Sequence, residues 1–341
     1  MGEELLSMPA TVTPRVSIVT PVWNAASYIT ETVVSVVSQL ESTDEYIVID
    51  DGSTDGTTAL LEDLSRGHGF QVIRQERGGE IAAVNAGVAA TSNSLVCVVN
   101  ADDPVLAGLV RRMKRAFQER PELVGAYPDW RMIDASGGSI RTVRTASYSY
   151  QAMLAEHFCI PGPGAFFRKD AVAGEPWRDP RAEGLSDFDF WLRLGLKGAP
   201  VQRIPEVLAT WRSHASGTTA TIDGSKLANA KIELVRRIFA RSDLPTDVQA
   251  MRGQALSAAY YQAALLGLRH SGVPSLRYAA ASYWHLPVWP KLAHHTQRRS
   301  MAHLGYALLQ PVSGWCHRLI DPLLPPRYRR SRVLAQTFGL E

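Results

Sequence analysis

The sequence predicts an α/β fold in which a mostly parallel sheet is flanked by helices. Three observations lead to this prediction. Short runs of β-branched and apolar residues recur at 16–20, 46–49, 71–74 and 95–99, as expected for strands buried in a sheet. Apolar residues repeat with helical spacing between these runs. Polar loops follow the runs, and strands that alternate with helices form parallel sheets with right-handed crossovers.

The first of these strands, VSIVT at 16–20, stops at Pro21. A helix is expected over 25–39, because apolar side chains recur there at intervals of three and four. The next two strands precede helices that begin after the DGSTDG turn and after the Gly78-Gly79 pair. Gly, Ser and Asp in such turns expose backbone donors and cap helices.

The second half of the predicted α/β region has a different pattern of helices and strands. A basic amphipathic helix over 106–117 is followed by a hairpin over 127–142, with Gly137 and Gly138 at its turn. A Gly- and Pro-rich loop runs into a strand near Phe167, and a helix is expected over 185–196. Two short strands then follow.

These two strands are expected at 201–204 and 207–211. The residues after 215 are rich in Gly, Thr and Ser, which is typical of a linker. Beyond them the pattern is almost wholly helical. We therefore divide the chain into a flexible lead-in (1–14), the α/β unit (15–219) and a helical, basic extension (220–341).

Two of the strands end in acidic residues. Asp50 and Asp51 follow the second strand, and Asp102 and Asp103 follow the strand at 95–99. In open α/β sheets, ligands bind beyond the carboxyl ends of the strands. Neighbouring carboxylates are costly unless a cation lies between them, and a hard divalent ion meets that need. The alternative for Asp103, which precedes a proline, is a helix N-cap.

Composition limits the class of protein. Hydrophobic residues make up 45% and charged residues 20% of the 341 positions, which is ordinary for a folded domain. The net charge of +3 is unevenly placed, since residues 269–341 carry +8 and the rest −5. The three cysteines are widely spaced and the first residues lack a signal-peptide pattern. The expected location is the cytoplasm.

Several segments together resemble the inverting glycosyltransferases of family 2, which have the GT-A fold. The segments occur in the family's order over residues 15–219: VSIVTPVWNAASYITETVVSVVSQ, YIVIDDGSTDGT, GGEIAAVNAGVAAT, VCVVNADDPVLAG, GPGAFFRKD, SDFDFWLRL and VLATWRSH. The resemblance implies transfer of a sugar from a nucleoside diphosphate donor, in particular a UDP-sugar, with GDP and dTDP sugars left open. The implied acceptor is a hydroxyl group of a glycan or a glycolipid.

The resemblance also implies roles for individual residues. Asp102, with His214, would hold Mn²⁺ or Mg²⁺, and Asp187 would be the general base. The implied nucleotide-binding residues are Thr20, Pro21, Trp23, Asp50, Asp51, Gly52, Ser53, Gly79, Asn85, Asn100, Ala101 and Arg212. Some of these residues have a plainer alternative: packing for Trp23, turn formation for residues 51–55 and helix capping for Asp187. Asp189, two residues after Asp187, is expected to point elsewhere and to act as a helix cap.

Three positions depart from the family pattern. Asn100 stands where many relatives carry the first Asp of a D-x-D motif, Val84 where many carry Arg, and Ser186 where a Glu usually precedes the catalytic Asp. Asn100 and Ser186 motivate a rival interpretation, a non-catalytic sugar-nucleotide-binding or scaffold protein. A nucleotidyltransferase is the other rival, but it needs a Gly-rich basic loop after the first strand, and PVWNAASY is not one.

The C-terminal extension mixes aromatic and basic residues, including Trp284, Trp289, Trp315 and the arginines between 327 and 332. Such a mixture is typical of a segment that lies on an anionic membrane surface. A peripheral position on the inner face of the membrane is one expectation. A helical cap with a solvated basic face is the other. A nucleic-acid partner is not expected, because no binding module accompanies the charge.

Overall fold

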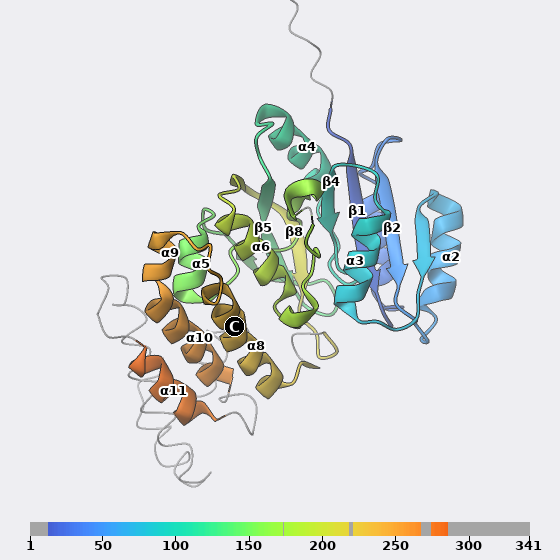
Figure 1. Ribbon diagram of the computed structural model, residues 1–341. Coiled ribbons are helices and arrows are strands. Elements are labelled where there is room, and N and C mark those ends of the chain that lie inside the picture. The colour runs from blue at the N-terminus through green and yellow to red at the C-terminus, as the bar shows by residue number, and fades with distance from the viewer. Residues whose placement is uncertain (1–12, 173, 218–220, 267–273, 286–341) are drawn as a thin grey trace, which may run out of the picture.

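The computed structural model describes residues 13–172, 174–217, 221–266 and 274–285. Within these ranges one mixed sheet carries helices on both faces (Figure 1). Its strands are β1 (Val16–Val22), β2 (Glu45–Asp50), β3 (Gln71–Arg74), β4 (Leu95–Val98), β5 (Gly125–Ile133), β6 (Ser139–Val143), β7 (Phe166–Arg168) and β8 (Val201–Arg212). The four strands predicted for the first half are all present.

The helices also follow the predicted order. The helices of the α/β part are α1 (Ile29–Val37), α2 (Thr57–His68), α3 (Glu80–Ala90), α4 (Leu109–Glu119), α5 (Tyr150–Glu156) and α6 (Ser186–Leu196), with 3-10 turns η1 (Lys169–Val172) and η2 (Pro180–Ala182). After the linker come α8 (Gly224–Phe239), α9 (Thr246–Ala250), α10 (Arg252–Leu266) and α11 (Ser275–Trp284).

The sheet has two parts. The strand order is β3-β2-β1-β4-β7-β5-β6, with β8 paired to β5. The pairs among β3, β2, β1 and β4 are parallel, so the carboxyl ends of these strands lie at one edge. β7 runs antiparallel to β4 and β5, and β5 and β6 form the predicted hairpin. The half of the sheet with the acidic strand ends is therefore wholly parallel, and the other half combines antiparallel pairs with the parallel pair of β5 and β8.

Each face of the sheet has its own hydrophobic cluster. Ile18 of β1 belongs to the cluster that includes side chains of α1, α2 and α4. Its neighbour Val19 belongs to the other cluster, with side chains of α3, α5, α6, α8, α9 and α10. Neighbouring side chains of a strand point to opposite faces, which gives this alternation. Figure 1 shows α3 and α6 in front of the sheet.

The helices that follow the linker share the second cluster. Leu234, Val235 and Ile238 of α8 are buried together with Trp191 of α6. Figure 1 shows α8 to α11 gathered at the end of the molecule that also carries α5 and α6. The predicted boundary near residue 220 therefore does not coincide with a break in the core. No helix of the described residues is long and apolar enough to cross a membrane.

Two local expectations are corrected by the structure. Residues 201–212 form a single strand, and the pairing with β5 shifts register where Ile204 and Val207 face consecutive residues of β5. A bulge at Pro205 thus replaces the predicted break. Proline has no backbone N–H to donate, and a bulge leaves such a residue unpaired in the strand. The helix expected from residue 106 begins at Leu109, after Gly108 with φ of 90°. Asp103 is therefore not its N-cap.

Parts of the prediction lie outside the described residues. These parts are most of the lead-in, Trp289, Trp315 and the arginines between 327 and 332.

Two helical glycines allow a test of how closely α3 packs on the sheet. A Cβ on Gly87 of α3 would lie 2.3 Å from Val19 Cγ1 and 3.0 Å from Ile49 Cγ1, whereas a Cβ on Gly67 of α2 would meet nothing within 4 Å. Gly87→Ala should lower the free energy of unfolding by about 1–3 kcal/mol through overpacking. Gly67→Ala should raise it by up to about 1 kcal/mol through helix propensity. Urea unfolding of both variants checks the opposite signs, and a stabilising Gly87→Ala would contradict the tight contact.

Candidate active site

The acidic strand ends meet at one edge of the sheet. β1 lies between β2 and β4 and pairs with both in parallel. Val22, the last residue of β1, faces Asp50 at the end of β2. The loop at 100–103 follows β4 on the other side of β1. The structure therefore brings the two predicted acidic turns to the same side of the sheet.

The loop after β4 is fixed through its second carboxylate. Asp103 is buried and accepts hydrogen bonds from the Arg212 backbone N–H at 2.7 Å and from Asn100 Nδ2 at 2.9 Å. Burial, followed by the neighbouring Asp102 carboxylate, raises the pKa of Asp103. Asn100, which is exposed, thus holds the loop through its amide, and buried Ala101 offers only its backbone.

Asp102 meets His214 from the far end of the α/β part. The Asp102 Oδ2 atom lies 2.8 Å from His214 Nε2, although 112 positions separate the two residues. The Asp102 side chain is 28% exposed, so this carboxylate is open to a ligand. His214 Nδ1 lies 2.9 Å from Ser216 Oγ, and the imidazole ring lies 4.8 Å from that of Tyr28. These contacts fix the ring beside the carboxylate.

This pair has the donor atoms of a metal site. Carboxylate oxygens are the ligands that Mg²⁺ and Mn²⁺ prefer, and imidazole nitrogen is a common metal ligand. Both donor atoms already converge on one place. Among the described residues, no group of three or more His, Cys, Asp or Glu side chains is arranged to hold a metal. A bound diphosphate and water can supply further ligands.

The Arg212 side chain is buried inside the protein, where it does not face a diphosphate. Its side chain is 1% exposed. Its Nε donates to the Asp102 carbonyl at 2.8 Å, its Nη1 to the carbonyls of Asp134 and Ala135, and its Nη2 to Glu31. These protein acceptors occupy the guanidinium, because a buried charge needs such partners. In this conformation Arg212 holds the loop of Asp102 and offers nothing to a diphosphate.

Asp50 is likewise an internal residue. Its side chain is fully buried, and its two oxygens accept from the Ser53 N–H at 2.9 Å and the Thr58 hydroxyl at 2.6 Å. Both oxygens accept hydrogen bonds within the turn and the side chain is fully buried, so Asp50 does not face a nucleobase in this conformation. Gly52 has φ of 73°, which allows the tight turn. The Ser53 hydroxyl accepts from the Asn24 N–H and so links the loops after β1 and β2.

Asp51 is the carboxylate that organises the start of α3. It accepts from the backbone N–H groups of Gly78 and Gly79, both at 2.8 Å, and from the Gln75 amide. The Arg77 guanidinium lies 3.6 Å from Asp51 and 3.3 Å from the ring centre of Trp23. The sequence did not indicate Arg77, although its place before the two glycines puts it at this edge.

The side chains implied to line the nucleotide therefore differ in exposure. Trp23 is 47% exposed and carries the Arg77 guanidinium on its face, so it is accessible from this edge. Thr20 and Pro21 are buried, and the Thr20 hydroxyl accepts from that of Tyr46 at 3.0 Å. Val84, the position where relatives carry Arg, lies in a hydrophobic cluster. It cannot contribute a charge.

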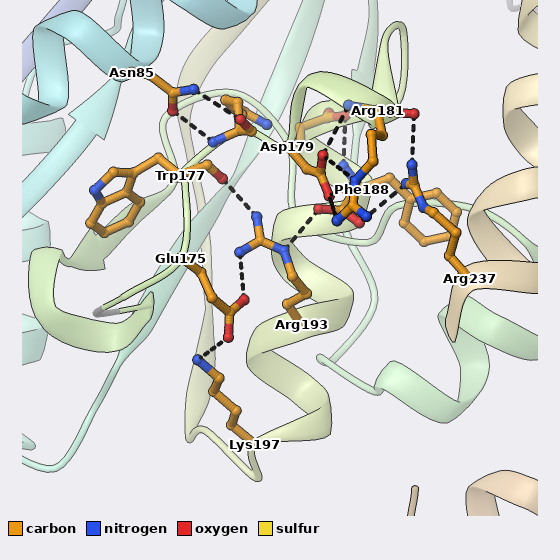
Figure 2. Close-up of polar contacts among 12 residues, drawn as sticks. Asn85, Glu175, Trp177, Asp179, Arg181, Phe188, Arg193, Lys197 and Arg237 are labelled. Atoms are coloured by element: carbon orange, nitrogen blue, oxygen red, sulfur yellow. Dashed lines mark hydrogen bonds and ion pairs between the residues drawn. The ribbon is translucent and has the colours of Figure 1, made fainter. Parts of the chain in front are cut away.

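Asn85 secures the segment that precedes α6. Its Nδ2 donates to the Arg178 carbonyl at 2.9 Å, and its Oδ1 accepts from the Arg178 N–H at 2.8 Å (Figure 2). The side chain is engaged by this pair of bonds instead of facing a nucleotide. It ties α3 to the loop that leads to Asp187.

A network of ion pairs supports α6 (Figure 2). Asp189 is buried and accepts from Arg193 Nε at 2.8 Å, while Arg193 also donates to Glu175 and to the Trp177 carbonyl. Burial raises the pKa of Asp189, and Arg193 opposes that rise. Arg237 of α8 donates to the Arg181 carbonyl at 2.8 Å. Asp189 is thus a structural residue.

Asp187 remains open to the solvent. It lies in the first turn of α6, is exposed, and accepts from the Phe188 N–H at 2.7 Å through one oxygen. Of the two carboxylates in this turn, only Asp187 is available to a substrate. Its role as the general base stays a prediction.

Comparison with known proteins supports the assignment of the fold. Residues 17–173 match the family model described as glycosyl transferase family 2. An uncharacterized glycosyltransferase of Nostoc sp. is 25% identical over 289 residues, which cover 75% of this chain and 85% of that protein. The O-antigen biosynthesis protein RfbC of Myxococcus xanthus is 33% identical over 215 residues, which are 61% of this chain but 16% of RfbC. A Rickettsia bellii relative is likewise matched over only 19% of its length.

Solved structures show the same fold. S. aureus TarS 1–349 in complex with UDP has a TM-score of 0.58 and 15% identity, with 95% of this chain and 87% of that chain covered. The mannosyltransferase PcManGT of Pyrobaculum calidifontis, solved with GDP-Man and Mn²⁺, has a TM-score of 0.54 and 18% identity, with coverage of 89% and 88%. Residues 17–173 of this chain therefore form a region of glycosyltransferase family 2, and the described residues have the GT-A fold.

Proposed function

We propose that the protein is a metal-dependent, inverting glycosyltransferase that moves a sugar from a UDP-sugar to a hydroxyl group of a glycan or glycolipid. The observation that carries this proposal is the contact of Asp102 with His214 at the sheet edge that also carries the DDGS turn. The UDP complex of TarS, and the GDP-Man and Mn²⁺ complex of PcManGT, support a nucleoside diphosphate donor and a divalent ion.

In the proposed reaction, Asp187 acts on the acceptor, and Asp102, His214 and Arg212 act on the leaving group. The acceptor oxygen attacks the anomeric carbon opposite the leaving group, and the bond from that carbon to the diphosphate breaks with its electron pair on the diphosphate. Asp187 accepts the proton of the attacking hydroxyl. Asp102 and His214 would hold Mn²⁺ or Mg²⁺, which supplies Lewis-acid stabilisation of the leaving diphosphate. Arg212 fixes the carbonyl of Asp102 and so the loop that carries these ligands.

The base-binding side of the proposal rests on the loops after β1 and β2. Trp23 presents an exposed ring and Asp51 lies beneath Arg77. The bulky wall made by Trp23 favours a pyrimidine over a larger purine. Because the Asp50 and Asp51 side chains are both buried, the expected preference for a UDP-sugar rests on this wall.

The rival function, a non-catalytic sugar-nucleotide-binding protein, rests on Asn100 and Ser186. Both binding and turnover must therefore be measured. A nucleotidyltransferase is less favoured, because the sequence after β1 is not the glycine-rich phosphate loop that such an enzyme needs. Asn24 in this loop is hydrogen-bonded to Ser53 and Thr54.

A thermal-shift screen should identify the donor class. UDP with Mn²⁺ should raise the melting temperature more than GDP with Mn²⁺, and UDP alone should raise it less, because a ligand that binds only the folded state stabilises it. Asp102→Ala should lose the metal-dependent part of the shift. Exposed Asp63, on α2, gives the control variant Asp63→Ala, which should keep it. An equal shift with excess EDTA would contradict the metal role.

Asp187→Asn should separate binding from chemistry. The amide has nearly the shape of the carboxylate but does not accept a proton at neutral pH. UDP affinity by calorimetry should be retained, while donor hydrolysis and transfer should fall by about 10²–10⁴. The matched variant Asp189→Asn should act mainly on stability, because Asp189 pairs with Arg193 inside the protein. UDP binding without any hydrolysis by the unmodified protein would favour the non-catalytic rival.

We also propose that the basic C-terminal region attaches the cytoplasmic protein to an anionic membrane surface. The positive charge of this region supports the proposal. Its residues Arg327, Arg329 and Arg330 lie outside the described residues. Vesicles containing phosphatidylglycerol should bind the full chain, and Glu at these three positions should weaken binding. Binding should also fall with salt, because exposed charges are screened over about 8 Å at physiological ionic strength. Equal binding to phosphatidylcholine vesicles would contradict the proposal.

A further inference from the structure

The family pattern places a carboxylate before the catalytic Asp, and this chain has Ser186 there. Ser186 is the first residue of α6 and is buried. Its hydroxyl lies 3.4 Å from Glu80 Oε2, although 106 positions separate the two residues. Glu80 is the first residue of α3. The first turns of two helices thus meet beside Asp187, and a carboxylate from α3 lies near the position where the sequence lacks one.

We propose that Glu80 is a second carboxylate of the acceptor site, which binds a hydroxyl of the acceptor sugar next to the one deprotonated by Asp187. This inference rests on the proposed glycosyltransferase function. It adds a residue that neither the motifs nor the comparisons indicated.

The start of α3 is held rigidly. Asp51 accepts the N–H of Gly79, the N-cap residue, at 2.8 Å, and Gly87 brings the same helix close to Val19 and Ile49. Glu80 therefore lies between the DDGS turn, on the donor side, and Asp187, on the acceptor side.

The surroundings of Glu80 are charged and incompletely paired. The Glu80 residue as a whole is exposed, but protein atoms surround its carboxyl group. This burial raises the pKa of Glu80. The Arg178 guanidinium opposes the rise, and the Asp187 carboxylate adds to it. Arg178 Nη1 is buried without a hydrogen-bond partner among the described residues. Cys159, close to both Asp187 and Arg178, is kept protonated because burial raises its pKa.

The C-terminal helices contribute to the same place. Burial lowers the pKa of Lys231 of α8 to about 8, and Asp187 opposes this change. Next to Lys231 is His157, which is 1% exposed and has no hydrogen-bond partner for either ring nitrogen among the described residues. The cluster of Glu80, Asp187, Arg178 and Lys231 thus contains two acceptors and two cationic donors.

This combination fits an uncharged sugar with adjacent hydroxyl groups. An ionised carboxylate only accepts hydrogen bonds, so two of them can receive two neighbouring hydroxyls. The unpaired Arg178 donor and the Lys231 ammonium can serve the oxygen atoms of the same sugar. The competing interpretation is that Glu80 only ties α3 to α6 through Ser186.

Glu80→Gln tests the proposal in two reactions of the donor selected by the thermal-shift screen: hydrolysis, with water as the acceptor, and transfer to added free monosaccharides. Loss of a hydrogen bond to a charged group should lower kcat/KM for transfer to a sugar about tenfold to a hundredfold. Hydrolysis, in which no acceptor sugar is bound, should keep its rate, and calorimetry should show unchanged UDP affinity. A residue that only ties α3 to α6 would change hydrolysis and transfer alike.

Glu183→Gln is the matched control, because Glu183 is an exposed carboxylate three residues before Ser186. It should leave the rates of hydrolysis and transfer and the UDP affinity unchanged. A wild-type rate of transfer in Glu80→Gln would overturn the proposal. An equal loss of hydrolysis and transfer, or a loss of UDP affinity, would also overturn it, because either would assign Glu80 to folding or to the donor. If the unmodified protein neither binds UDP nor hydrolyses any donor, the proposed function itself fails.

Discussion

The buried guanidinium of Arg212 is the interaction on which the geometry of the site depends. It joins the end of β8 to the loop of Asp102, to the β5–β6 hairpin through the carbonyls of Asp134 and Ala135, and to Glu31 of α1. A charge removed from water is tolerated only when its donors are satisfied. The loop and the hairpin are therefore held to positions that keep their carbonyls aimed at Arg212. Because His214 follows two residues later, the same contacts bring its ring to Asp102.

A second constraint concerns the first turn of α6, where one carboxylate is buried and the other is exposed. Asp189 is enclosed by Arg193 and anchors α6, whereas Asp187, two positions earlier, lies on the solvent side. Two residues along a helix correspond to roughly half a turn, so their side chains point to different sides. The network that surrounds Asp189 fixes the helix and leaves Asp187 free to meet a substrate.

The sequence was sufficient to predict those features that depend on local pattern. The strands at 16–20 and 95–99, the hairpin and the helix at 186–196 were recognised from apolar spacing and turn residues, and the structure has them. The fold class is confirmed too. What remained hidden was the direction of individual side chains. Asp50 and Arg212 occupy motif positions, yet both face inward, and their partners come from residues that only the tertiary fold brings near.

The same limit applies to residues that pair over long sequence distances. Nothing near Ser186 in the sequence indicates Glu80, because their contact depends on how α3 packs against the sheet through Gly87. Likewise, the single strand at 201–212 could not be distinguished from two short ones, since Pro205 ordinarily interrupts a ladder. A bulge is a property of the pair of strands and not of one sequence segment.

The shared core of α6 and α8 has a consequence for how such a protein diversifies. The match to the family model ends at residue 173, before Asp187, His214 and Lys231. Asp187, the base of the proposed reaction, and Lys231 therefore come from a part of the chain that the family model does not describe, while Asp102, the DDGS turn and Glu80 lie within it. In the proposed reaction, substitutions in α8 would change the acceptor side without disturbing the sheet edge. Acceptor choice can then drift from one descendant enzyme to the next while donor chemistry is inherited unchanged.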